Sequence, residues 1–256
     1  MKLKSKIDIC KLCQENKTLA KSHIIPEFWY ESLYNKNGKY IKPDFDRTKG
    51  LEILQNGIKE PLLCVDCEGF LNSNYEQPIH QFWKKNVNIH EMDFSEQFFV
   101  LQNLNYSKFK LYHLCNLWRA NHSINDMFNQ VQLGSKHEGK IRTMLINEEP
   151  GPEIDYPILG SILFRRETGE VMDDMMISPS RTKTKDGHVA YNLLYGGIYW
   201  WIGVSSHIRL GEKTESLTKD GKMILHKSFV EDDPRIIKKA VKWSELFSEV
   251  PESLLK

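Results

Sequence analysis

Four of the five cysteines form two pairs with the same spacing. The pairs read CKLC, which contains Cys10 and Cys13, and CVDC, which contains Cys64 and Cys67. Two such pairs supply four thiolates, a common tetrahedral ligand set for structural Zn²⁺. A redox-active CxxC motif needs one pair and no second copy. The spacing therefore predicts a structural zinc site formed by all four cysteines, with fifty residues inserted between the pairs.

A single histidine lies between the cysteine pairs, in the stretch TLAKSHIIPEF. Two β-branched residues follow His23, and Pro26 cannot continue a central strand, so His23 is predicted to lie near the end of a strand. An ordinary strand histidine is one interpretation. The other is a general base, because a neutral imidazole with a pKa near ~6.5 can take a proton from water at physiological pH.

The composition is typical of a folded protein with a packed core. The chain has 256 residues, 40% of them hydrophobic, with 35 basic and 34 acidic side chains. This balance gives no overall basic footprint for nucleic acid, but residues 1–60 carry twelve basic and eight acidic side chains. No apolar run fits a signal peptide or a membrane span. We therefore expect a cytoplasmic protein that has no membrane partner.

The elements that must position these residues predict an α+β fold. In the first part, a strand begins at Thr18, a short helical turn covers 27–34, and a helix follows the second cysteine pair. Asp66 is the expected N-cap of this helix, and Pro78 is expected to break or kink it. In the second part, apolar periodicity predicts helices at 106–123, 135–151 and 233–247, and strands within 156–167, 188–207 and 221–230.

Some features of the second part have structural as well as functional interpretations. Cys115 lies in the apolar helix and is predicted to be a small core residue. Ser135 and Glu138 have capping-box spacing. Arg119 and His122 share a helical face and could touch phosphate, but a buried network or a surface pair is the favoured explanation. The basic stretch 181–188 is typical of a solvated hairpin tip, and Tyr199, Trp200 and Trp201 are typical of a sheet buried on both sides.

The order of the motifs resembles the HNH nucleases of the ββα-metal, or His-Me finger, superfamily. Their zinc-bearing members run CxxC, Asp-His-Ile-x-Pro, Asn-Leu, and then Leu-Cys-x-x-Cys with His or Asn after it; this chain has CKLC, SHIIP and LLCVDCE. GIKEPLLCVDCEGFLNSNYE and LCNLWRANHSINDMFNQVQLGSKHEGKIR resemble a group of largely uncharacterised prokaryotic HNH-like proteins. The resemblance implies a zinc-stabilised ββα-metal module at 1–88 and an α+β accessory region at 89–256 for substrate selection or assembly.

The resemblance also implies a chemistry. His23 would be the general base, and Glu68, alone or with Asn72, would hold a catalytic Mg²⁺ or Mn²⁺. Glu76 is a weaker candidate, because eight residues of helix place it roughly 12 Å from Glu68 along the axis. The zinc would be scaffold only. The expected substrate is DNA, or else RNA, in phage defence or a mobile element, with an activating protein partner or self-association also compatible.

Three departures from the family pattern support a rival hypothesis. Ser22 stands where the family has Asp, and Lys59 stands near the place of the central Asn that orients the base. Glu68 replaces His or Asn, and it has a second interpretation as a favourable charge at a helix N-terminus. The rival is a zinc-stapled HNH-like module that has lost catalysis and binds nucleic acid or protein as a regulator.

Overall fold

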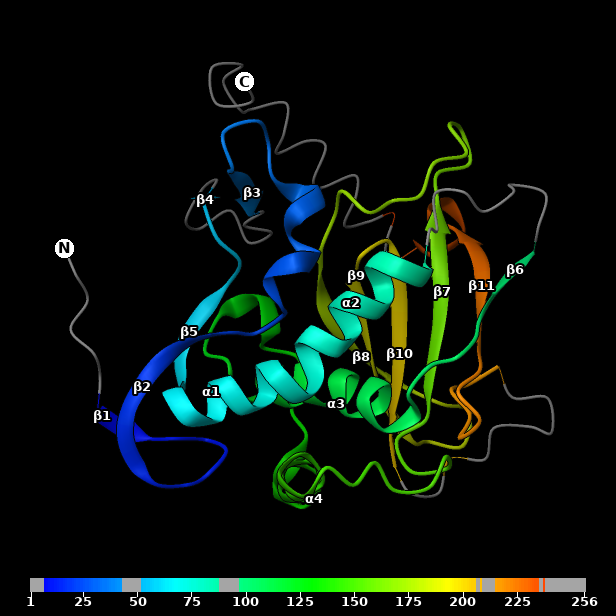
Figure 1. Cartoon of the computed structure of the whole chain (residues 1–256). Coiled ribbons are helices and arrows are strands. Elements are labelled where there is room, and N and C mark those ends of the chain that lie inside the picture. The colour runs from blue at the N-terminus through cyan, green and yellow to red at the C-terminus, as the bar shows by residue number, and fades with distance from the viewer. Residues whose placement is uncertain are drawn as a thin grey trace.

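The protein has a mixed α+β architecture, seen here in a computed structural model (Figure 1). The structure describes residues 7–42, 52–87, 97–205, 208, 215–234 and 237. Within them lie a three-stranded sheet, a two-stranded sheet and a six-stranded sheet. Helices α2, Gln77–Asn86, and α3, Tyr106–His122, lie across one face of the six-stranded sheet (Figure 1). The three-stranded sheet lies on the far side of these helices from the large sheet (Figure 1). None of the helices among these residues is long and apolar enough to cross a membrane.

The three-stranded sheet carries His23 and is antiparallel throughout. Its strands, in the order β1-β2-β5, are Ile7–Ile9, Asn16–His23 and Lys59–Cys64. The strand expected from Thr18 is confirmed, although it begins two residues earlier and ends at His23 itself. Two 3₁₀ turns, Glu27–Trp29 and Glu31–Leu33, replace the single helical turn expected there. The insertion between the cysteine pairs also forms a small sheet of β3, Tyr40–Lys42, and β4, Glu52–Leu54.

A helix follows β5 directly, as expected, but its predicted N-cap is wrong. Cys64 is the N-cap of α1, Val65–Leu71, because its backbone is still extended; Asp66 lies inside the first turn. Pro78 does not end the helix. A π-helical stretch, Asn72–Glu76, interrupts the α-helical ladder first, and Pro78 then occupies the first turn of α2, Gln77–Asn86, where its missing N–H is tolerated.

The six-stranded sheet is formed by the second part of the chain. Its order is β6-β11-β7-β10-β9-β8, and only the β11–β7 pair is parallel. The bounds in chain order are Phe98–Leu101, Ile158–Phe164, Ile177–Lys183, Val189–Tyr195, Ile198–Val204 and Met223–Phe229. The four inner strands match the predicted runs. The edge strands β6 and β8 were not predicted, and β8 contains Pro179, which only an edge position tolerates well.

Helix α3, Tyr106–His122, forms the centre of the molecule and confirms the predicted apolar helix. Every residue from Phe109 to Ala120 is buried, including Cys115. Helix α4, Gly134–Asn147, packs on α3. Its predicted capping box is wrong, because the helix begins at Gly134, one residue before the Ser135 that was expected to cap it. Glu138 instead accepts hydrogen bonds from Trp118 and His122.

Trp29 joins the N-terminal part of the chain to the helices and to the large sheet. Its Nε1 donates a hydrogen bond to the Tyr112 hydroxyl at 2.5 Å, and its ring packs against Tyr195. One continuous cluster of buried side chains runs from Cys10 to Leu225. Because this cluster includes residues from both parts of the chain, the division into two domains at residue 88 stays a prediction. The helix predicted at 233–247 lies almost entirely outside the described residues.

Candidate functional site

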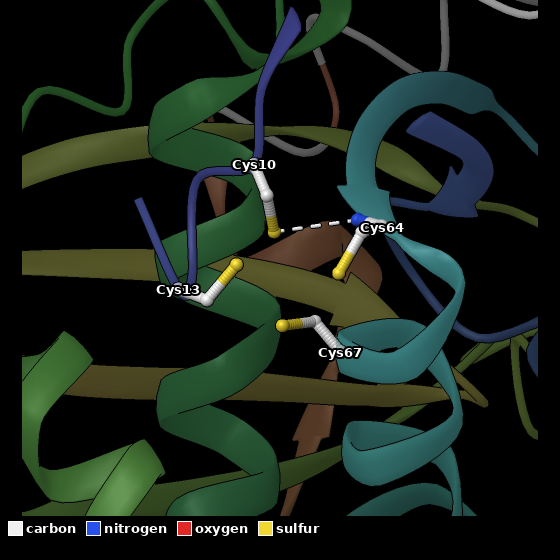
Figure 2. Close-up of side chains that lie close together, drawn as sticks. All are labelled: Cys10, Cys13, Cys64 and Cys67. Atoms are coloured by element: carbon white, nitrogen blue, oxygen red, sulfur yellow. Dashed lines mark hydrogen bonds between the residues drawn. The ribbon is translucent and has the colours of Figure 1, made fainter. Parts of the chain in front are cut away.

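The four cysteines of the two CxxC pairs form one cluster (Figure 2). Cys10 and Cys13 flank the turn between β1 and β2, Cys64 ends β5, and Cys67 lies in the first turn of α1. Their four sulfur atoms all lie within 4.8 Å of one another. Tetrahedral zinc with Zn–S bonds of ~2.3 Å holds its sulfurs ~3.8 Å apart, so this donor set fits the ion.

The electrostatics of the cluster also favour a bound cation. Burial raises the pKa of Cys10, but hydrogen bonds from backbone N–H groups, including that of Cys64 at 3.3 Å, lower this pKa to about 7. Burial and the neighbouring cysteines raise the pKa of Cys67. Four thiolates therefore cannot coexist here without a compensating positive charge. A structural zinc would supply that charge and would tie the turn after β1 to β5 and α1.

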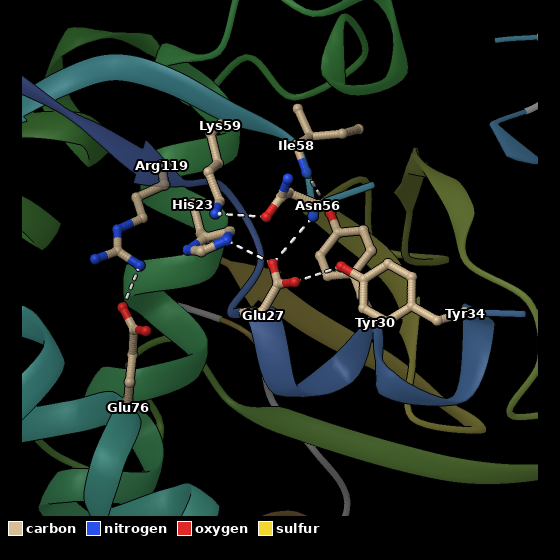
Figure 3. Close-up of polar contacts among 10 residues, drawn as sticks. His23, Glu27, Tyr30, Tyr34, Asn56, Ile58, Lys59, Glu76 and Arg119 are labelled. Carbon is tan, nitrogen blue, oxygen red and sulfur yellow. Dashed lines mark hydrogen bonds and ion pairs between the residues drawn. The ribbon is translucent and has the colours of Figure 1, made fainter. Parts of the chain in front are cut away.

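His23 forms a close pair with Glu27 at the end of β2 (Figure 3). His23 Nε2 lies 2.6 Å from Glu27 Oε2, which also accepts the backbone N–H of Gly57 at 3.0 Å. Glu27 Oε1 accepts the Tyr34 hydroxyl. Burial raises the pKa of Glu27, but the Tyr34 and Gly57 hydrogen bonds and His23 together hold it below its usual range. Glu27 is therefore a fixed, charged partner for the imidazole.

The imidazole of His23 is held neutral and partly accessible, with 19% of the side chain exposed. Burial lowers its pKa, the positive charge of Lys59 lowers it further, and Glu27 partly opposes both. Because Nε2 faces a carboxylate, Nε2 carries the proton and Nδ1 is the basic nitrogen. Within the described residues, Nδ1 forms no hydrogen bond. An oriented neutral histidine of this kind is suited to accept a proton.

Glu68, the expected metal ligand, belongs to a separate buried ion network. Arg119 of α3 has no exposed surface, and its Nη1 lies 2.5 Å from Glu76 Oε1 (Figure 3). Arg119 Nη2 lies 3.7 Å from Glu68 Oε2. Glu68 and Glu76 were expected to be too far apart to share one ion, but both meet a single cation, because the guanidinium spans the gap between them. The buried network, one of the two structural interpretations of Arg119, is confirmed.

Ser22 lies beside the same network. It is fully buried, and its hydroxyl oxygen has no hydrogen-bond partner within standard distance among the described residues. Burial raises the pKa of Glu68, whereas Arg119 and the nearby Ser22 hydroxyl lower it. Asn72 lies one turn further along, at the start of the π-helical stretch, and is half-buried. Glu68 and Asn72 lie in the helical segment after the second cysteine pair, as predicted. The ion pair between Glu68 and Arg119 was not predicted.

These contacts decide how well the site fits a catalytic divalent ion. Glu27 already accepts three hydrogen bonds, and Glu68 and Glu76 already meet Arg119. A hard cation needs carboxylate oxygens of its own, so it would compete with the guanidinium for the same atoms. Each carboxylate near His23 therefore faces a cation or hydrogen-bond donors of the protein, and the catalytic Mg²⁺ or Mn²⁺ stays a prediction, whereas the four cysteines fit zinc.

The other residues that the sequence offered as candidates for binding phosphate or bases pack or pair within the protein. His122 Nε2 pairs with Glu138 at 3.0 Å. The stretch 181–188 runs from the end of β8 through the hairpin turn, as expected. Trp200 is buried against α3, and its neighbour Tyr199 packs on the opposite face of the sheet. Glu27 was missed, although its position four residues after His23, in a turn, was visible in the sequence.

Comparisons with protein-family models, with curated proteins and with solved structures found no match for this chain. Function is therefore inferred from the residues around His23 and the cysteine cluster.

Proposed function

We propose that this protein is an HNH-type nuclease that hydrolyses phosphodiester bonds of DNA or RNA, with His23 as the general base. The observation that carries the proposal is the His23–Glu27 pair at the end of β2. His23 ends strand β2, which pairs in antiparallel fashion with β5, and β5 runs directly into α1. The histidine therefore belongs to a unit of two antiparallel strands followed by a helix. This order of elements is the one that the resemblance to the ββα-metal superfamily implies.

The proposed reaction uses the two nitrogens of His23 differently. Nδ1 takes a proton from a water molecule, and the water oxygen forms a bond to phosphorus. The bond from phosphorus to one ester oxygen breaks, and the departing alkoxide takes a proton from solvent. Glu27 holds Nε2–H and stabilises the imidazolium that forms, as a buried carboxylate does for a catalytic histidine.

The cysteine cluster has a supporting role in this proposal. Zinc held by Cys10, Cys13, Cys64 and Cys67 has no open position for water, so it contributes folding free energy and no Lewis-acid chemistry. It would hold the end of β5 against the turn before β2, and a β-bulge between Ala20 and Lys21 separates this part of the strand pair from the His23–Lys59 pair. In this proposal the zinc would stabilise the scaffold and take no part in the chemistry.

A second candidate function is favoured by the buried ion network. Arg119 neutralises Glu68 and Glu76, and Ser22 offers no charge for a metal ion. A chain with these features would retain the zinc-stapled scaffold and bind nucleic acid or a protein without cleaving it. This regulatory module remains the alternative to the nuclease.

Cleavage by a His23 variant tests the two functions. Zinc-loaded protein is incubated with supercoiled plasmid and with RNA, in Mg²⁺, in Mn²⁺ and without added divalent ions. For the nuclease, we expect cleavage by wild type and a loss of about 10²–10⁴-fold in His23→Ala, with zinc content and melting temperature unchanged. Full cleavage by His23→Ala would refute the base assignment, and the absence of wild-type cleavage under all three conditions would favour the binding module.

A matched control is available elsewhere in the chain. His226 on β11 also has its Nε2 2.6 Å from a carboxylate, that of Glu215. His226→Ala therefore removes the same type of pair from a different sheet, and we expect it to cleave as wild type does.

A further inference from the structure

Lys59 is the residue that faces His23 most directly across the strands. It is the first residue of β5, and its Cα is paired with that of His23 in the antiparallel register. Residues that are directly opposite in an antiparallel pair point to the same face, with Cβ atoms ~4.5–5.5 Å apart. Figure 3 shows the two side chains next to each other, with the Lys59 ammonium directed toward Asn56.

Lys59 has no carboxylate partner among the residues that the structure describes. Its Nζ contacts Asn56 Oδ1 at 3.4 Å, and within the described residues it forms no ion pair. The acidic groups nearby have other partners: Glu27 holds His23, and Glu76 holds Arg119. Lys59 is half-buried, so part of its side chain is covered while the site remains open to solvent.

A half-buried cation without a counter-ion, beside a neutral histidine, is an arrangement that attracts an anion. The two side chains lie next to each other on paired positions of β2 and β5 (Figure 3), and the charge of Lys59 is one of the causes that lower the pKa of His23. A lysine ammonium binds phosphate oxygens as a point charge. The carboxylates nearest to this site face positive or hydrogen-bonding groups of the protein: Glu27 pairs with His23, and Glu68 and Glu76 lie beside Arg119. Lys59 is the side chain placed to offer positive charge to a phosphate.

We propose that Lys59 binds the phosphate group of the nucleic acid at His23 and stabilises the negative charge that develops on it during attack. This proposal rests on the proposed nuclease function, because it names the residue that binds the substrate of that same site. The non-bridging oxygens of the phosphodiester lie against the Lys59 ammonium, and the phosphorus then faces the water held by His23. A preorganised cation at this point lowers the barrier without itself exchanging a proton.

Binding measured in a cleavage-deficient background tests the proposal directly. The His23→Ala protein and its Lys59→Met double variant are titrated with fluorescein-labelled oligonucleotides, single-stranded and duplex, over a salt series. Loss of one phosphate contact should lower the slope of log K against log salt by about one for duplex DNA, and weaken binding about tenfold near 0.1 M salt. Lys59→Arg should retain most of the affinity, because the positive charge is kept.

Lys84→Met is the matched control. Lys84 is an exposed lysine near the end of α2, so its replacement changes the net charge equally without touching the strand pair. We expect Lys84→Met to bind as the background protein does. Zinc content and melting temperature are measured for each variant, so that a folding defect is not mistaken for lost binding.

A second readout reports on the contact between Lys59 and the base. The pKa of His23 is followed by NMR of its imidazole C–H resonance in otherwise wild-type protein. Lys59, Glu27 and Glu76 are the charged groups that influence this imidazole. Lys59→Met should raise the pKa, because it removes one of the causes that lower it, and Lys84→Met should not change it.

The outcomes separate this inference from the nuclease proposal. If wild type cleaves but Lys59→Met binds with unchanged affinity and salt slope, the role of Lys59 is overturned and the nuclease stands. If wild type cleaves no substrate but binding still depends on Lys59, the nuclease fails and phosphate binding by Lys59 stands. An unchanged His23 pKa in Lys59→Met would also contradict the contact on which the inference rests.

Discussion

The His23 imidazole lies 2.6 Å from the Glu27 carboxylate, and the two residues are separated only by the short turn that ends β2. Glu27 is itself held by Tyr34 and by the backbone of Gly57. The orientation of the histidine is therefore set by a segment that follows it in the chain, and not by the helix that carries the expected metal ligands. This relationship makes Glu27 the positioning residue of the site.

The first prediction concerns the charge of Glu27. Glu27 opposes the causes that lower the pKa of His23, so Glu27→Gln should lower this pKa further. A general base must be neutral, so cleavage rises with pH through the His23 pKa, and this acid limb should move to lower pH in the variant. Removing a residue that orients the base should also reduce the plateau rate by ~10–100-fold.

The measurement is the pH profile of kcat/KM for plasmid or RNA cleavage, with Glu31→Gln as the control. Glu31 is an exposed acid in the neighbouring 3₁₀ turn, and its loss should leave the profile unchanged. An acid limb that moves to higher pH in Glu27→Gln would contradict the assigned pairing.

The second prediction concerns zinc. We expect one equivalent of zinc per chain, and Cys64→Ser should lose most of it together with much of the soluble yield. Cys64 ends β5 and supplies one of the four sulfur atoms of the cluster, so the variant removes one ligand. A structural zinc contributes an apparent ~10–16 kcal/mol in small metal-dependent domains. The metal content is measured by elemental analysis of the purified protein.

Cys115→Ser provides the control for zinc. Cys115 is buried in α3, apart from the cluster of four, so this variant should keep its full equivalent of zinc even if it melts at a lower temperature. A wild-type chain without zinc, or a Cys115→Ser chain depleted of it, would show that the ligand set is wrong.

The third prediction concerns the buried ion network. Arg119→Met leaves Glu68 and Glu76 without their cation in a buried site, and breaking a buried ion pair in this way costs about 3–5 kcal/mol. Adding Glu76→Gln to this variant should recover part of the loss, because an unpaired charge is removed. Urea unfolding at neutral pH measures both effects.

Arg165→Met is the comparison for this prediction. Arg165 lies at the same 2.5 Å from Asp174, but its side chain is 32% exposed and that of Asp174 is 56% exposed. Ion pairs on the surface contribute about 0–1 kcal/mol. Equal losses of stability in the two arginine variants would mean that Arg119 does not compensate buried charge.

Sequence patterns predict the parts of the site that depend on local spacing. The paired cysteines and the strand ending at His23 follow from residue types a few positions apart, and so does the buried helix around Cys115. The link from Arg119 to Glu76 spans 43 residues and depends on how α3 packs against the helix after β5. The hydrophobic periodicity of a sequence does not predict a contact between residues so far apart. The role of Lys59 likewise depends on strand register, which motif spacing alone does not specify.

The sequence was also less informative at the edges of the fold. The inner strands β7, β9 and β10 are largely buried and stand out as apolar runs of seven residues. The edge strand β6 is apolar but only four residues long, and β8 is polar and contains Pro179. Asp66 and the Ser135–Glu138 pair have the residue types of helix caps. In the structure these acidic side chains contact residues far away in the sequence and do not cap helices. Asp66 lies 3.5 Å from the ammonium of Lys17, and Glu138 accepts a hydrogen bond from Trp118.

The last prediction concerns the contact between Trp29, which lies in the same 3₁₀ turn as Glu27, and Gly196 of the large sheet. Gly196 lies in the turn between β9 and β10 with a φ of +60°, and a Cβ added there would lie 2.0 Å from the Trp29 ring. Gly187, in the turn between β8 and β9, has a φ of +82° and open space around it. An alanine at either position would therefore carry backbone strain of ~1–2 kcal/mol, and only the alanine at Gly196 would also clash with a neighbouring side chain.

We expect Gly187→Ala to lose only the strain energy, and Gly196→Ala to lose a further ~1–3 kcal/mol, as overpacking of a core typically costs. Trp29 lies two residues after Glu27, so a displaced ring should also move Glu27 and reduce cleavage by Gly196→Ala but not by Gly187→Ala. Trp29→Leu should relieve the clash, so combining it with Gly196→Ala gives a double-mutant cycle measured by urea unfolding. Strictly additive losses in that cycle would show that Gly196 does not act through Trp29.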